Sequence, residues 1–151
     1  MAHLGHDFDM TMKARVKWNE GMSFIAEAGS GHAVVLDGSP DHGGRNLGPR
    51  PMEMVLLGLG GCSAFDVVLI LNKLKQKFDD CFVEIEATRK DQVPAVFETI
   101  KLMFVVVGEE LVEKHVKRAV DLSMEKYCSV SEMLKSTVNI EFGYKILKSM
   151  D

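Results

Sequence analysis

Positive charge is nowhere concentrated in this sequence. Its 18 Lys and Arg residues are outnumbered by 22 Asp and Glu residues, which gives a formal net charge of −4 at pH 7. Binding to DNA or RNA needs a clustered basic face, because much of the affinity comes from releasing counterions from the phosphate backbone. The lysines here occur singly along the chain, and we therefore expect no nucleic-acid partner.

Cysteine is scarce, with only Cys62, Cys81 and Cys128. An odd number of cysteines does not suit a secreted scaffold held by disulfides. Residues 1–9 also lack the basic start, the apolar run and the cleavage site of a secretory signal. We therefore expect a cytoplasmic protein whose thiols are normally reduced, so that any disulfide is transient and functional.

Several familiar ligand-binding patterns are missing. The cysteines and histidines show no C-x-x-C or H-x-x-E-H spacing, and the glycine-rich segment 37–51 lacks the Gly-Lys-Ser/Thr of a phosphate-binding loop. We therefore expect no metal, no nucleotide and no other cofactor. His115 in the second predicted helix and His32 and His42 in or near loops are more often surface or satisfied core residues than bases, so we expect no Cys-His dyad.

Apolar residues, in contrast, are frequent enough to build a core. They make up 46% of the chain, against 26% charged residues, as in ordinary globular proteins. Alternating patterns predict six strands, and helical patterns predict a long helix over residues 51–78, a second over 108–127 and a short third one from residue 129. The strands are expected at residues 11–18, 22–27, 33–36, 82–89, 97–107 and 137–145. This order favours an α+β class, with residues 12–151 as a single domain and residues 1–11 as a mobile N-terminal extension.

The long helix is apolar almost all round between residues 54 and 71. A membrane span is the alternative interpretation, but Asp66 interrupts the run, glycines weaken it and no second span is found. We therefore expect a central buried helix and no membrane partner. A chain of this size can hardly surround such a helix alone, and the pattern predicts a homodimer in which it packs against its counterpart.

Cys62 lies among small residues in the middle of this helix. Glycines in a helix cost roughly 1 kcal/mol each relative to Ala, so the neighbouring Gly60 and Gly61 indicate a close approach by another element. A buried, inert cysteine in tight helix packing and a reactive thiol both fit this pattern.

Cys128 lies just before Ser129, which opens a capping-box pattern ending at Glu132. The start of a helix can favour a thiolate, although a small residue filling a helix junction fits equally well. Cys81 follows Asp79 and Asp80, whose negative charges disfavour a thiolate. We assign no role to Cys81.

On these residues the chain resembles the OsmC/Ohr family and, within it, the YhfA-like subgroup. The segments that carry the resemblance are 13–18, 51–55, 60–68, 119–123 and 125–131. The resemblance implies an OsmC-like fold, with antiparallel sheets wrapped around two long central helices in an intertwined dimer. It also implies that Cys62 attacks a small-molecule hydroperoxide and becomes a sulfenic acid, that Cys128 resolves it as a disulfide, and that a dithiol reductant reopens the disulfide.

Peroxidases of this family stabilise the thiolate with an Arg that is held by a Glu. Met52 stands where that Glu would align, with Glu53 directly after it, and Arg45 is the first Arg candidate with Arg50 second. Our leading hypothesis is therefore a thiol-dependent hydroperoxide reductase that uses Cys62 and Cys128, supported by Arg45 and Glu53. The alternative is a catalytically inactive OsmC-like protein that binds a small hydrophobic or thiol-containing ligand at the dimer interface. The third hypothesis is a purely structural dimer in which the cysteines have no function.

Overall fold

The computed structural model describes residues 11–150, and the expected N-terminal extension lies outside them except for Thr11. The described chain divides into two compact units, one up to Met54 and the other from Val55. Together they contain strands and helices in the predicted order, and the α+β class is confirmed.

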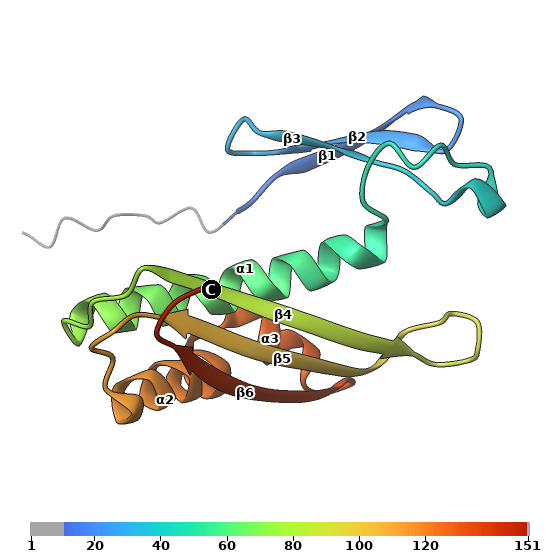
Figure 1. The fold of residues 1–151 in the computed structure, drawn as a ribbon. Helices are drawn as coiled ribbons and strands as arrows, with labels where there is room; N and C mark the ends of the chain where they lie inside the picture. Colours follow the sequence, from blue (N-terminus) through green and yellow to red (C-terminus); the bar gives the residue numbers. More distant parts are fainter. Residues whose placement is uncertain (1–10, 151) are drawn as a thin grey trace, which may run out of the picture. The chain divides into compact units, whose positions relative to one another are not determined.

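The first unit is built around a three-stranded antiparallel sheet (Figure 1). Its strands are β1 (Ala14–Glu20), β2 (Ser23–Ala28) and β3 (Ala33–Leu36), in that order. Gly21 adopts φ +58° in the turn between β1 and β2, a backbone conformation that glycine reaches without steric cost. The predicted hairpin therefore forms where the sequence places it.

The buried side chain of Asp37 organises the loop that follows β3. Its carboxylate accepts hydrogen bonds from the backbone N–H groups of Gly38 at 2.7 Å and of Arg45 and Leu47 at 3.2 Å each. Burial alone would raise the pKa of Asp37, but these bonds outweigh it and the pKa is lowered. The loop contains the 3-10 turn η1 (Pro40–His42).

The second unit contains a sheet of β4 (Asp80–Arg89), β5 (Phe97–Val107) and β6 (Asn139–Leu147), in that order (Figure 1). The pair β4 and β5 is antiparallel, whereas β5 and β6 run parallel. The expectation of antiparallel sheets is thus wrong for this pair. The helices between β5 and β6 carry the chain back to the starting end of the sheet, and such a crossover produces parallel neighbours.

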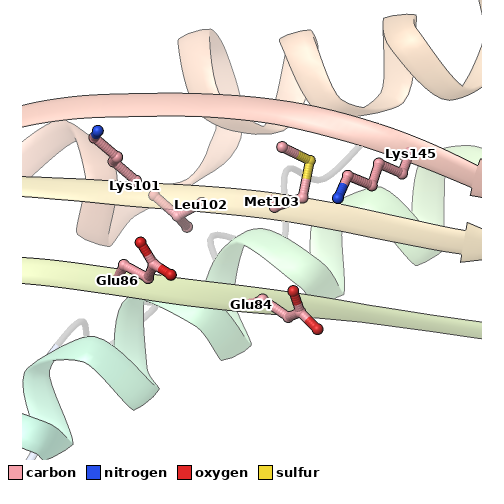
Figure 2. A pocket seen from close by; sticks show the side chains of 6 residues that line it. All are labelled: Glu84, Glu86, Lys101, Leu102, Met103 and Lys145. Carbon is pink, nitrogen blue, oxygen red and sulfur yellow. The ribbon is translucent and has the colours of Figure 1, made fainter.

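The two faces of this sheet differ in chemistry. Alternate residues on β5, among them Ile100, Leu102 and Phe104, are buried. The opposite face carries a shallow depression with charged side chains around it, shown in Figure 2. These side chains are Glu84, Glu86, Lys101 and Lys145, with Met103 between them. The alternation is that of a sheet with one face in the core and one face exposed to solvent.

The long helix α1 spans Pro51–Lys73 and ends before the predicted residue 78. It stops because Lys75 takes a left-handed conformation, with φ 56°. The N–H of Gln76 bonds to the carbonyl of Leu71, and the N–H of Lys75 bonds to that of Asn72, each at 3.0 Å. These two bonds form a Schellman cap, which closes the helix without a glycine.

One face of α1 is packed against the sheet of the second unit. Leu59, Val67 and Leu71 are fully buried, and a Cβ added at Gly60 would lie 2.8 Å from Cδ1 of Ile85 on β4. Gly60 therefore allows the close approach between helix and strand that the sequence indicated.

Among the described residues, α1 is one helix that is long and apolar enough to cross a membrane by length and composition. Only 28% of its most apolar 18-residue window is buried inside the chain. The core helix of a protein without a membrane span can be equally long and apolar. The expectation of no membrane partner therefore stays a prediction.

The second predicted helix is shorter than expected and is divided. It begins at Glu113 instead of residue 108, forms α2 (Glu113–Leu122), and continues as the π-helical turn η2 (Ser123–Tyr127). The short helix α3 (Ser129–Leu134) follows after the break at Cys128, where the sequence predicts one.

Candidate functional site

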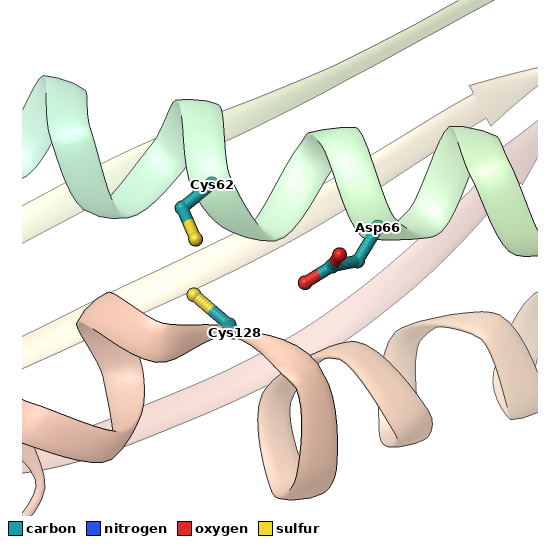
Figure 3. Close-up of side chains that lie close together, drawn as sticks. All are labelled: Cys62, Asp66 and Cys128. Atoms are coloured by element: carbon teal, nitrogen blue, oxygen red, sulfur yellow. The ribbon is translucent and has the colours of Figure 1, made fainter. Parts of the chain in front are cut away.

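The second unit brings three reactive side chains to one place. The sulfur atoms of Cys62 and Cys128 and a carboxylate oxygen of Asp66 all lie within 4.8 Å of one another. Figure 3 shows the two thiols pointing toward each other between α1 and the start of α3, with the Asp66 carboxylate directed into the same space. The structure therefore joins the two cysteines that the sequence singled out, although 65 residues separate them.

The helical repeat of α1 places Cys62 and Asp66 side by side. Residues four apart lie on the same face of a helix, one turn above the other. Both are half-buried, and they lie between the buried face of α1 and its exposed face. Their side chains thus reach the junction with the other helices without entering the core.

Hydrogen bonds hold both the backbone and the side chain of Cys128. Its backbone N–H donates to the carbonyl of Ser123 at 2.8 Å, and its sulfur, as the N-cap of α3, accepts from the N–H of Ser131 at 3.4 Å. Ser123 in turn donates from Oγ to the carbonyl of Ser63 at 2.8 Å, in a buried contact. Ser63, which follows Cys62, is therefore hydrogen-bonded to Ser123, the residue that accepts the N–H of Cys128.

The helix start that could favour a thiolate at Cys128 is opposed by the burial of this side chain. Burial raises the pKa of the thiol to about 11, although the N–H groups of Ser131 and Val130 lower it, and the neighbouring Cys62 raises it further. The side chain is only 2% exposed, so the loss of hydration outweighs the cap. Cys128 is a neutral thiol at pH 7.

Asp66 was not among the predicted site residues, because in the sequence it appears only as an interruption of the apolar run. Its Oδ2 atom is buried and has no hydrogen-bond partner among the described residues. Burial also raises the pKa of its carboxyl group. Its spacing of four residues from Cys62 places both side chains on one helix face, but no sequence pattern shows that Cys128 joins them.

The two predicted supporting residues belong to the first unit and have partners there. Arg45 pairs with Glu20 at 3.4 Å, and not with Glu53. Glu53 accepts a hydrogen bond from the backbone N–H of Arg50 at 2.8 Å and lies 3.6 Å from its guanidinium group. Glu53 thus caps the start of α1, and its arginine partner is Arg50 instead of Arg45.

Cys81 lies on β4, away from the residues that form this cluster. Burial raises the pKa of its thiol, and the negative charge of Asp80 raises it further. The direction agrees with the sequence interpretation, although burial is the larger cause.

Comparison of the chain with known proteins identifies its family. The family model for OsmC-like protein matches residues 42–143. Protein YhfA of Escherichia coli K12 is 48% identical over 136 residues, which cover 90% of this chain and 98% of that protein.

Solved structures give the same result for the fold. A hypothetical protein from Aquifex aeolicus is 29% identical, with a TM-score of 0.81 over 92% of this chain and 98% of that one. An organic hydroperoxide resistance protein OsmC from Legionella pneumophila is 16% identical, with a TM-score of 0.67 over 92% and 97%. The chain belongs to the OsmC-like family.

Proposed function

We propose that this protein is a thiol-dependent hydroperoxide reductase that uses Cys62 and Cys128 as a redox pair. The observation that carries the proposal is the approach of the two thiols from distant elements to within 4.8 Å. The resemblance to proteins named for organic hydroperoxide resistance supports the same chemistry.

Cys62 performs the first step. Its thiolate attacks one oxygen of the hydroperoxide, the O–O bond breaks, and the alcohol leaves with a proton while Cys62 becomes a sulfenic acid. Cys62 is the better nucleophile of the two because it is half-buried, whereas Cys128 is buried and its pKa is raised to about 11. The sequence hypothesis names Arg45 and Glu53 as supporting residues, but Arg45 pairs with Glu20, and Glu53 pairs with Arg50.

Cys128 performs the second step. It loses its proton and attacks the sulfur of the Cys62 sulfenic acid, which releases water and forms a disulfide. The two sulfur atoms start within 4.8 Å of each other, and a disulfide bond is about 2.05 Å long, so the two side chains must move toward each other to close it. A dithiol reductant then reopens the disulfide by exchange and leaves as its own disulfide. The cytosol keeps such reductants available, in agreement with the expected location.

In this proposal the working form is a homodimer. Each copy consists of a single OsmC-like domain, residues 12–151. The face of α1 that the chain leaves exposed is apolar: Leu57 is 59% exposed, Phe65 70% and Leu69 44%. Gly58 and Gly61 on this face have open space around them. Apolar residues with glycines on one exposed stripe fit close packing against a second copy of the helix. The match of the family model across both units supports a single domain.

One observation favours the alternative, a catalytically inactive protein that binds a small hydrophobic or thiol-containing ligand at the dimer interface. The pKa of Cys128 is raised to about 11, which slows any step that needs its thiolate. A ligand that co-purifies with the protein, together with thiols that remain reduced in excess hydroperoxide, would support this alternative.

Turnover of cumene hydroperoxide and of hydrogen peroxide with a dithiol reductant tests the proposal. We expect Cys62→Ser to abolish turnover and Cys128→Ser to stop at a sulfenic acid that a dimedone-type reagent labels. Cys81→Ser is the matched control and should retain full activity. No turnover by the unmodified protein, with all three thiols reduced, would contradict the proposal.

A further inference from the structure

We propose that the reduced protein binds one thiophilic divalent cation, with Zn²⁺ as the reference ion. The ligands are the sulfur atoms of Cys62 and Cys128 and the carboxylate of Asp66 (Figure 3). Binding at this site does not depend on hydroperoxide turnover, so it goes beyond the proposed function.

The spacing of the three donor atoms fits a small cation. In tetrahedral zinc sites the Zn–S distance is about 2.3 Å and the Zn–O distance about 2.0–2.2 Å, which separates the ligand atoms by roughly 3.5–3.8 Å. The three atoms here lie within 4.8 Å of one another, so a contraction of about 1 Å, within the reach of side-chain rotation, gives that geometry.

The donor set also selects the kind of cation. Binding displaces the protons of both thiols, and the resulting thiolates favour soft or borderline ions such as Zn²⁺ and Cd²⁺ over Mg²⁺ and Ca²⁺, which prefer oxygen ligands. The third ligand is a carboxylate, as in many zinc sites, and three protein ligands leave the fourth position of a tetrahedral ion open for a water molecule.

The environment of the ligands gives independent support. Oδ2 of Asp66 is buried without a hydrogen-bond partner among residues 11–150, and a buried polar atom of this kind calls for a specific explanation. A cation between the carboxylate and the thiols supplies the missing partner. The N–H of Ser131, which donates to the sulfur of Cys128 at 3.4 Å, fixes that ligand as outer hydrogen bonds do in metal sites.

Sequence inspection could not find this site, because its ligands follow no short motif. Cys62 and Asp66 come from one turn of α1, and Cys128 from the N-cap of α3. The same sulfur atoms form the disulfide in the proposed reaction, so cation binding and the disulfide exclude each other. Oxidation would release the ion, and the ion would protect the thiols from hydroperoxide.

The test uses the reduced full-length protein and Cd²⁺ as the spectroscopic probe. We expect the ultraviolet charge-transfer absorption of a cadmium thiolate to rise to a plateau at one equivalent of Cd²⁺, and added Zn²⁺ to remove it by competition. Histidine side chains do not produce this absorption, so it reports the thiols alone. The oxidised protein should show no signal.

Variants assign the ligands. Cys62→Ser and Cys128→Ser should each lower the apparent affinity at least 100-fold, and Asp66→Asn at least 10-fold, whereas Cys81→Ser should bind as the unmodified protein does. Circular dichroism and thermal melting confirm that each variant is folded before it is scored. Full binding by the folded Asp66→Asn variant, loss of the signal in Cys81→Ser, or no thiolate absorption in the unmodified protein would overturn the proposal.

Discussion

The hydroxyl of Ser123 donates a buried hydrogen bond of 2.8 Å to the carbonyl of Ser63. Ser63 follows Cys62 on α1, and the carbonyl of Ser123 accepts from the N–H of Cys128 at 2.8 Å. This chain of bonds links the backbone around one thiol to the backbone around the other.

Removing the hydrogen bond between Ser123 and Ser63 should let the thiols of Cys62 and Cys128 move more freely relative to each other. We expect Ser123→Ala to lower the free energy of unfolding by about 1–2 kcal/mol, because a buried hydrogen bond is lost and a small void is left. Disulfide formation after hydroperoxide addition should also slow several-fold. Ser136→Ala is the matched control, since its hydroxyl is exposed and bonds to the carbonyl of Met133 at 3.5 Å, and it should change neither quantity. Equal rates in Ser123→Ala and unmodified protein would show that the bond does not position the thiols.

The pKa of Cys128 predicts its reactivity with pH. Because burial raises the pKa of this thiol to about 11, we expect Cys128 in the Cys62→Ser variant to react with iodoacetamide more slowly at pH 7 than a free thiol of ordinary pKa. Its rate should keep rising above pH 9. A rate that levels off below pH 8 would contradict the burial argument.

The same pKa shift predicts a loss of stability at high pH. The folded value is raised above the ordinary value of 9.0, so the neutral thiol stabilises the fold fully below pH 9.0, and this contribution is lost as the pH rises through about 11. Denaturation by urea between pH 8 and 11 measures it. The Cys128→Ala variant should lose less stability across this window than the unmodified protein, and a parallel decline in both would contradict the assignment.

Gly60 and Gly61 are adjacent on α1, and substitutions at the two positions test different contacts: packing within the chain and packing between two copies. A Cβ at Gly61 meets nothing within 4 Å inside the chain, whereas one at Gly60 lies 2.8 Å from Ile85. We expect Gly61→Ala to leave the fold intact but to weaken the proposed dimer, as measured by analytical ultracentrifugation. Gly60→Ala should lower the free energy of unfolding by about 1–3 kcal/mol through overpacking, less the gain in helix propensity. An unchanged dimer in Gly61→Ala would exclude this face as the interface.

Asp66 should destabilise the metal-free protein at neutral pH. Burial raises the pKa of this carboxyl group above its ordinary value of 3.8, so its contribution to stability is present below that value and is lost as the pH rises through the folded one. In the presence of a chelator, the stability of the unmodified protein relative to Asp66→Asn should therefore fall as the pH rises above 3.8. A relative gain over this range would show that the carboxylate has a favourable partner.

The sequence predicted the fold well where the pattern was local. The strands and the start of α1 follow from alternation, from Gly21 in a turn and from Pro51 at a helix start. The end of α1 was missed because Lys75 adopts a left-handed conformation that its residue type does not indicate. The parallel pairing of β5 and β6 depends on the crossover through α2 and α3, which no local pattern specifies.

The candidate site was predicted only in part. Cys62 and Cys128 could be named from their motifs, but the reactivity of Cys128 could not, because its burial depends on tertiary packing and outweighs the helix cap. Asp66 was missed because its role requires the position of Cys128, which is distant in sequence. The pairing of Glu53 with Arg50 is local, within the first turn of α1, and could have been read from their spacing.

The most direct test of the redox pair is the mapping of disulfides in reduced protein after one equivalent of cumene hydroperoxide, by peptide mass spectrometry without reductant. The account predicts one intramolecular disulfide between Cys62 and Cys128, the loss of two hydrogens from the intact mass, and a Cys81 thiol that remains free. A protein that keeps all three thiols reduced under these conditions, or that links Cys81 instead, would contradict it.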